Sequence, residues 1–184
     1  ADIEGFHPNL RRGLKKALRE FHSSDGWKWM IHAPHSPEDM EILKKLCKDR
    51  FGSNCFFQIS RNTVFFDEMA KRMEDETFCS VLSKEGNVAS IVMGFIHRDV
   101  FYYFLSGMSQ GFEEMRPGLL NLYFLIEHCK NRGCNAFDFL KGEERYKTEF
   151  NASREELDQY LIHTAHVGIG FKLYSLIHTI KNMH

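Results

Sequence analysis

The chain has 184 residues, of which 43% are hydrophobic and 27% are charged, an ordinary composition for a globular protein. Its 24 Lys and Arg residues are balanced by 25 Asp and Glu residues, so the bulk charge gives no reason to expect binding to DNA or to a membrane surface. The length predicts a single domain over residues 1–184, able to bury about 70% of the surface of its unfolded chain.

The cysteines and the start of the chain bear on where the protein works. The five cysteines are an odd number, and none stands in a CxxC or Cys/His spacing of a zinc site. We therefore expect reduced thiols, a cytoplasmic protein and no metal. The sequence shows no signal peptide and no apolar run of membrane-spanning length. It begins with Ala1 instead of Met, which indicates a trimmed chain, such as the C-terminal part of a longer protein.

Turn residues and hydrophobic periodicity predict a helix, a strand and two further helices in the first part of the chain. These elements are expected at His7 to Phe21, Trp27 to Ala33, Ser36 to Phe51 and Asn62 to Met73. In the last of them, Phe65, Phe66, Met69 and Met73 recur at helical spacing, which predicts a stripe that faces the core.

The first predicted helix carries a basic face opposite its leucines. We interpret this face as solvated, with a surface for an acidic ligand as the alternative. It is formed by Arg11, Arg12, Lys15, Lys16 and Arg19.

The segment from Phe101 to Phe150 organises the rest of the chain. A three-stranded meander, expected at Phe78 to Leu82, Val88 to Ile96 and Val100 to Leu105, leads into it. A Gly-bearing loop, a helix that starts at Pro117 and stops at Gly133, a strand at Ala136 to Leu140 and a helix at Glu143 to Phe150 then follow. A strand, a loop and a helix start beside Arg116 form a site for an anion, because backbone N–H groups and the helix dipole favour negative charge there. The alternative is an ordinary crossover with a surface arginine.

The same segment resembles the signature of the GNAT-fold acetyltransferases of the cellulose-biosynthesis type, which are related to FemABX-like peptidyltransferases. The resemblance implies an α/β (α+β) domain with a mixed, mostly antiparallel sheet flanked by helices. The predicted order of elements agrees with that fold. The positions that carry the resemblance are Pro117, Gly118, Gly133, Asp138, Phe139, Leu140, Gly142, Tyr146, Lys147 and Phe150.

The resemblance also implies where an acyl donor would bind. The strands Phe101–Leu105 and Ala136–Leu140 would splay apart and form a wedge for it. Arg116 and the backbone of Gly118, Leu119 and Leu120 would hold its pyrophosphate, which makes acetyl-CoA or another acyl-CoA the expected donor. The chain lacks the usual Gln/Arg-x-x-Gly-x-Gly/Ala loop of coenzyme A-binding members, so a tRNA donor is the alternative.

Three side chains are the expected catalytic groups. Lys147 would stabilise negative charge on a donor phosphate or on an oxyanion. Asp138 would act as general base, or form a structural ion pair with Lys147 or Arg145. Tyr146 would protonate a leaving thiolate, or serve as a packed aromatic residue.

The end of the chain is predicted to hold a strand at Asp158 to His163 and an amphipathic helix at Phe171 to Lys181. The helix indicates packing or a subunit contact, such as that of a homodimer. His163 and His166 have a spacing that suits a metal on a helix, but no carboxylate stands at a fitting distance in the sequence.

Together these features predict an acyltransferase that moves an acyl group from acyl-CoA to an amine or hydroxyl of a small molecule, such as a sugar, polysaccharide or cell-envelope precursor. One alternative is an aminoacyl-tRNA-dependent peptidyltransferase of the FemABX type. The other is a GNAT-like module that binds without catalysis in polysaccharide production.

Overall fold

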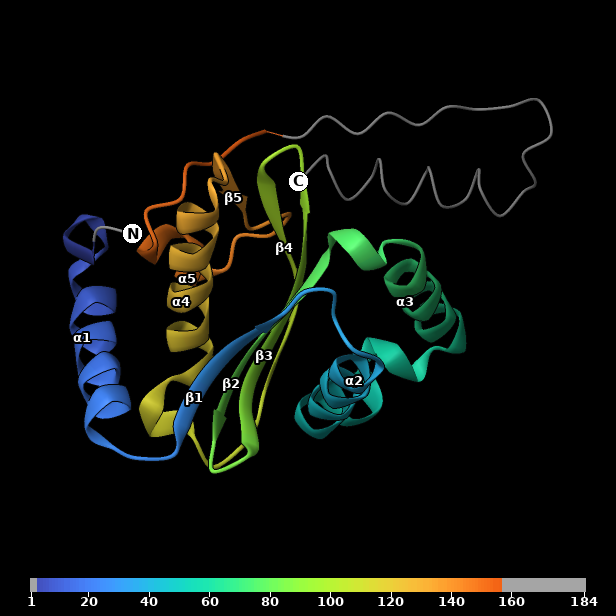
Figure 1. Cartoon of the computed structure of the whole chain (residues 1–184), viewed down its shortest axis with the longest axis horizontal. Helices are drawn as coiled ribbons and strands as arrows, with labels where there is room; N and C mark the ends of the chain where they lie inside the picture. Colours follow the sequence, from blue (N-terminus) through green and yellow to red (C-terminus); the bar gives the residue numbers. More distant parts are fainter. Residues whose placement is uncertain (1–2, 157–184) are drawn as a thin grey trace, which may run out of the picture. The chain divides into compact units, whose positions relative to one another are not determined.

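The structure is a computed structural model and describes residues 3–156 (Figure 1). All of the described helices and strands lie in one compact unit, Ala1–Ala152; a second unit starts at Ser153. The predicted strand at 158–163, the predicted helix at 171–181 and the pair of His163 and His166 lie outside the described residues. The single domain over the whole chain therefore stays a prediction.

Five strands form one mixed sheet in the order β1-β2-β3-β4-β5. The first four are antiparallel to their neighbours, whereas β5 lies parallel to β4 and is reached through a helical crossover, as parallel neighbours require. The strands are β1 (Trp27–His32), β2 (Thr77–Lys84), β3 (Asn87–His97), β4 (Val100–Met108) and β5 (Ala136–Asp138).

Tight turns join β2 to β3 and β3 to β4. Glu85 and Gly86 have φ values of 50° and 80°, and Arg98 and Asp99 have φ values of 50° and 61°. Two successive residues with positive φ match the right-handed twist of the strands that they connect. The predicted three-stranded meander is thereby confirmed.

Helices cover both faces of the sheet (Figure 1). On one face Leu14 and Leu120, from two different helices, pack against Leu82 and Ala89 of the sheet. Because β2 and β3 are covered on both sides, their residues are buried almost without alternation. The helices on this face are α1 (Pro8–Ser23), α4 (Pro117–Arg132) and the short α5 (Arg145–Glu149); α2 (Pro37–Phe51) and α3 (Ser60–Arg72) lie on the other.

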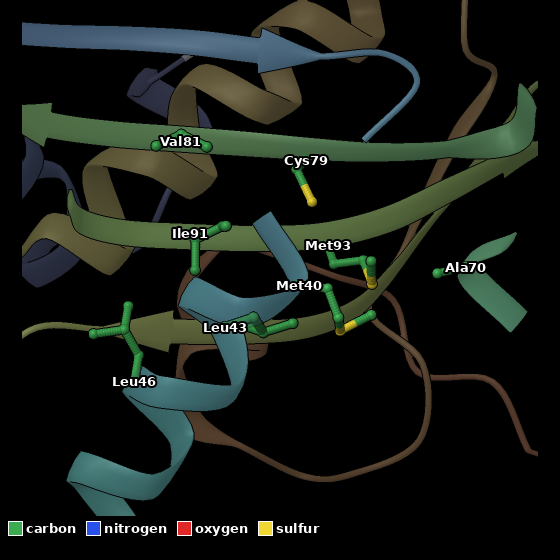
Figure 2. Close-up of a cluster of buried hydrophobic side chains, with 8 residues drawn as sticks. All are labelled: Met40, Leu43, Leu46, Ala70, Cys79, Val81, Ile91 and Met93. Atoms are coloured by element: carbon green, nitrogen blue, oxygen red, sulfur yellow. The ribbon is translucent and has the colours of Figure 1, made fainter. Parts of the chain in front are cut away.

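Figure 2 shows the core beneath α2 and α3. Met40, Leu43 and Leu46 of α2 point toward side chains of β2 and β3. The expected aromatic and Met stripe of α3 is only partly correct. Phe66 and Met69 pack against this core, but Phe65 is 57% exposed because it lies on the outer side of a helix that buries fully only Ala70.

The ends of the helices follow their capping residues. At the start of α2, Ser36 accepts a hydrogen bond from the Asp39 N–H and donates its own N–H to the Asp39 carboxylate, a complete capping box. At the end of α4, Gly133 adopts a φ of 90°, and the N–H of Cys134 donates to the carbonyl of Cys129. Several predicted boundaries were wrong by two to three residues. The helix α3 starts at Ser60 and α5 only at Arg145, whereas α1 extends to Ser23. Among the strands, β2 extends to Lys84 and β4 to Met108, but β5 ends at Asp138 instead of Leu140.

Candidate functional site: the wedge between β4 and β5 and the start of α4

The strands β4 and β5 diverge soon after they pair. Their register runs from Val100 opposite Ala136 to Tyr102 opposite Asp138 and then stops, although β4 continues to Met108. Beyond Tyr102, within the described residues, β4 pairs only with β3. A wedge therefore opens at the place where the sequence predicted one.

Aromatic side chains line the base of the wedge. The ring of Tyr103 on β4 lies 6.1 Å from that of Phe137, 6.0 Å from that of Phe139 and 6.3 Å from that of Tyr146, centroid to centroid. Burial raises the pKa of the Tyr146 phenol, and Tyr103 and Glu144 raise it further. Burial also raises the pKa of Tyr103. Both hydroxyls therefore stay protonated. Sequence reasoning missed Tyr103, whose only signal was its place in an aromatic strand.

The start of α4 lies beside the open end of β4. Arg116 holds a left-handed backbone conformation, with φ 48° and ψ 55°, immediately before Pro117. Its carbonyl accepts the N–H groups of Leu119 and Leu120 at 2.9 and 3.1 Å. An anion here would have to share those two donors, whereas Gly118 N–H has no acceptor within the described part of the chain. The roles of Leu119 and Leu120 as pyrophosphate donors stay predictions.

A buried amide fixes α4 onto the sheet one turn after its start. The side chain of Asn121 is fully buried. Its Nδ2 donates to the carbonyls of Ser80 and Ser90 at 3.0 and 3.2 Å, and its Oδ1 accepts from Trp29 Nε1 at 3.1 Å and from the Ser80 hydroxyl. These bonds join α4 to β1, β2 and β3, so they set the position of the helix start relative to the sheet.

Lys147 holds the loop that follows β5. Its Nζ donates to the carbonyls of Leu140, Lys141 and Gly142 at 3.0, 3.1 and 3.3 Å, and lies 2.8 Å from Glu144 Oε2. The ammonium group therefore binds the carbonyl groups of this loop, in which Leu140 adopts a left-handed backbone conformation with a φ of 58°. Its role toward a phosphate or an oxyanion stays a prediction.

Asp138 has a different partner from those expected. Its Oδ1 accepts the N–H of Leu140 at 2.7 Å. No ion pair with Lys147 or Arg145 is formed in the described structure; Arg145 pairs instead with Glu149 at 2.7 Å. The expected structural ion pair is therefore wrong, because an aspartate in this position can cap the turn of its own chain. Its role as a general base stays a prediction.

A wide cleft adjoins the wedge. It has a volume of about 950 Å³ and lies between α1, α5 and the segment before α4, with Tyr146 reaching both the cleft and the wedge. Three glutamates also line it. Its cations are Arg12, Lys16, Arg19, Arg116 and Arg145.

The predicted basic face of α1 is therefore divided in two. Arg11 and Lys15 form ion pairs with Glu4 at 2.7 and 2.6 Å, whereas Arg12, Lys16 and Arg19 face the cleft.

The sheet, the wedge and the helix that starts beside it can now be compared with known proteins. Residues 8–148 match the family described as the Acetyltransferase (GNAT) domain. The chain belongs to this GNAT acetyltransferase family. The fold that the resemblance implied is confirmed, and the protein is an acyltransferase of the GNAT type.

Solved structures share the fold at low sequence identity. A GNAT family acetyltransferase from Staphylococcus aureus is 16% identical, with a TM-score of 0.50 over 74% of this chain and 99% of that one. The aminoglycoside acetyltransferase AAC(6')-Iy, in complex with a bisubstrate analogue of CoA, is 11% identical, with a TM-score of 0.53 over 74% and 99% of the two chains. FemX is 10% identical, with a TM-score of 0.55; the match covers 94% of this chain but 53% of FemX. No curated protein matches this GNAT domain.

Among the described residues of this GNAT domain, no group of three or more His, Cys, Asp or Glu side chains is arranged to hold a metal ion. None of its described helices is both long enough and apolar enough to cross a membrane.

Proposed function

We propose that this GNAT domain transfers an acyl group, in the first place acetyl, from acyl-CoA to an amine or hydroxyl group of a sugar, polysaccharide or cell-envelope precursor. The observation that carries this proposal is the early end of the pairing between β4 and β5, beside the start of α4. Backbone groups of β4 beyond Tyr102 are left for an amide-containing donor chain.

The start of α4 supports an anionic donor. A helix N-terminus favours negative charge, and here it combines the Gly118 N–H with the guanidinium of Arg116. A Cβ at Gly118 would overlap Met108 Sδ, so glycine lets Met108 of β4 pack against the start of α4. The CoA analogue bound to AAC(6')-Iy, a protein of the same fold, supports acyl-CoA as the donor.

The proposed chemistry is a direct attack on the thioester. The acceptor amine or hydroxyl adds to the carbonyl carbon, its proton passes to a base or to solvent, and the C–S bond breaks as the thiolate leaves. Tyr146, which is held protonated by burial, would give its proton to that thiolate. Asp138 is the proposed base, and Lys147 is proposed to fix the loop that forms one wall of the wedge.

The acceptor class rests on two observations. The signature from Pro117 to Phe150 resembles that of the cellulose-biosynthesis type. In addition, an aminoglycoside acetyltransferase of the same fold, from a soil metagenomic sample, has been solved with sisomicin and with trehalose. Both favour a sugar-like acceptor.

A tRNA-dependent peptidyltransfer of the FemABX type is the second candidate. The match to FemX extends over 94% of this chain, and the cleft beside α1 is rich in cations. A module that binds without catalysis is the remaining alternative, and the same experiment addresses all three.

The test is a calorimetric titration of acetyl-CoA into the protein. We expect micromolar binding by the wild type and by Gly5→Asp, because Gly5 has open space around it. Gly118→Asp, which places a carboxylate at the start of α4, and Arg116→Ala are expected to lose it. No heat from a cooperatively folded wild type would overturn the acyl-CoA donor and favour the tRNA or non-catalytic alternative.

A further inference from the structure

The cleft beside α1 gathers cations, most of which have no ion-pair partner among the described residues. Arg12, Lys16 and Arg19 follow one another at four- and three-residue spacings, so they share one side of α1. Like charges at these spacings destabilise a helix. Arg12, Lys16 and Arg116 form no ion pair within residues 3–156.

The opposite arrangement exists one residue earlier on the same helix. Arg11 and Lys15 also stand four residues apart, but both reach the carboxylate of Glu4. Glu4 thus pairs with one row of cations on α1, Arg11 and Lys15. The other row, Arg12, Lys16 and Arg19, faces the cleft. The difference points to a ligand that supplies the missing negative charge.

Gly13 brings a further cation to this row. A Cβ at Gly13 would lie 2.5 Å from Arg116 Nη1, so the guanidinium rests on the bare backbone of α1. Gly13 lies inside the helix α1, and Arg116 adopts the left-handed backbone conformation; both choices of residue are unfavourable for local structure. Here they place Arg116, which comes from the start of α4, against α1 at Gly13, in the cleft that Arg12 and Lys16 also line.

The acids of the cleft do not cancel this charge. Both oxygens of Glu113 accept the N–H of Gly111, at 3.0 and 2.9 Å, and backbone hydrogen bonds lower the pKa of its carboxyl. Glu149 is occupied by Arg145. Five cations nevertheless face three glutamates in the cleft, so positive charge remains in excess.

We propose that this cleft is a phosphate site to which α1 contributes Arg12 and Lys16, with Arg116 completing it. A volume of about 950 Å³ suits a nucleotide-sized molecule. Guanidinium groups bind phosphate oxygens through paired hydrogen bonds, and a lysine adds a mobile point charge. Tyr146 connects the cleft to the wedge, so one molecule can place phosphates in the cleft and its reacting group in the wedge. The ligand class is a small molecule that carries a diphosphate or a phosphomonoester.

The phosphate site itself does not depend on the proposed acyl transfer. Only the identity of the molecule that carries the phosphates rests on that proposed function. They belong either to the nucleotide end of the acyl donor or to a phosphorylated acceptor. The cleft itself is tested with inorganic pyrophosphate, which reports on neither reaction.

The first experiment measures pyrophosphate binding by calorimetry at low and at high salt. Arg12→Ala and Lys16→Ala are expected to weaken it about tenfold each, the factor that corresponds to 1.4 kcal/mol. The control is Lys71→Ala, which removes the same charge from the exposed last turn of α3 and should leave binding unchanged. Raised salt should weaken binding by the wild type. Equal binding by all four proteins, or none by the wild type, would overturn the proposal.

Gly13→Ala separates binding from folding. The new methyl group displaces only the flexible end of Arg116, while alanine favours the helix, so the melting temperature should rise. Pyrophosphate binding should nevertheless fall. A Gly13→Ala protein that is more stable and binds pyrophosphate as well as the wild type would contradict the part given to Arg116.

The source of the phosphates is then read from larger probes. A loss of affinity for CoA in Lys16→Ala, with binding of UDP-N-acetylglucosamine unchanged, assigns the site to the donor; an equal loss for dephospho-CoA then identifies its diphosphate, and a loss for CoA alone its phosphomonoester. A loss of affinity for UDP-N-acetylglucosamine, with CoA binding unchanged, assigns it to the acceptor. If acetyl-CoA binds normally and pyrophosphate does not, the cleft proposal fails and the acyl transfer stands. If pyrophosphate binding depends on Lys16 and acetyl-CoA does not bind, the cleft proposal stands and the proposed transfer from acyl-CoA fails.

Discussion

Lys147→Met is expected to loosen the loop after β5 and to lower the stability of the whole domain. Methionine keeps the length of the aliphatic chain but removes an ammonium group that is bonded to three carbonyls and to Glu144. The side chain of Lys147 is only 11% exposed, whereas the loop residues whose carbonyls it contacts are exposed and can be hydrated by water. We therefore expect a loss of about 2 kcal/mol, within the range for hydrogen bonds to a charged group. For a protein of this length that corresponds to a fall in melting temperature of roughly 4–8 °C.

Thermal and urea unfolding, followed by circular dichroism, measure this loss. Lys141→Met is the matched control, because Lys141 lies in the same loop and its side chain is exposed. A Lys147→Met protein that melts like the wild type but no longer binds acetyl-CoA would refute the structural assignment. Lys147 would then be a ligand for the substrate, as the sequence predicted.

The ion pair of Lys147 and Glu144 also predicts how the stability of the protein changes with pH. The hydrogen bond from Lys147 holds the pKa of Glu144 below its usual value. A carboxyl whose pKa is lowered by folding adds stability above its unfolded pKa and loses it as the pH falls through the folded pKa. The stability difference between the wild type and Lys147→Met should therefore narrow as the solution is acidified.

Three other substitutions test the packing around the site. Asn121→Leu removes the amide between α4 and the sheet, so buried carbonyls and Trp29 lose a hydrogen-bond partner. The free energy of unfolding, measured in urea, should fall by about 3 kcal/mol. An unchanged urea midpoint would contradict this. Gly94→Ala places a Cβ 2.5 Å from the carbonyl of Tyr102, so a loss of about 3 kcal/mol is expected. Burial, with a contribution from a nearby arginine, lowers the pKa of His128. The wild type should thus lose stability relative to His128→Phe as the pH falls below roughly 6.5, and parallel pH curves would argue against it.

Much of the fold could be predicted because its signals are local. Gly86 and its neighbours specify the tight turn between β2 and β3, Ser36 and Asp39 specify the start of α2, and Gly133 specifies the end of α4. Each of these residues acts within a few positions of itself, through φ or through a capping hydrogen bond. The wedge was predicted differently, as something that the resemblance to the GNAT signature implies.

The contacts inside the site depend on long-range geometry and could not be predicted in this way. Asn121 looks like a polar interruption of an apolar helix until Ser80 and Ser90, at least 31 residues away, are placed beneath it. The approach of Arg116 to Gly13 joins two helices across about a hundred residues of sequence. The three carbonyls bound by Lys147 could not be predicted either, because they become acceptors for it only after the loop has turned at Leu140.

The wedge is flanked by the start of α4 on one side and by the loop after β5 on the other. These two flanks, called the α4 wall and the opposite wall, are held in different ways, and this affects how a ligand enters and leaves. The α4 wall is fastened by Asn121 to three strands at once, so its helix start cannot shift without breaking buried hydrogen bonds. The opposite wall, from Phe139 to Glu144, is held at its far end by the single ammonium group of Lys147. Adjustment to a ligand should therefore occur on the β5 side. The α4 side is preorganised and adds little ordering cost to binding, so the lifetime of a complex should follow the opening rate of the Lys147 loop.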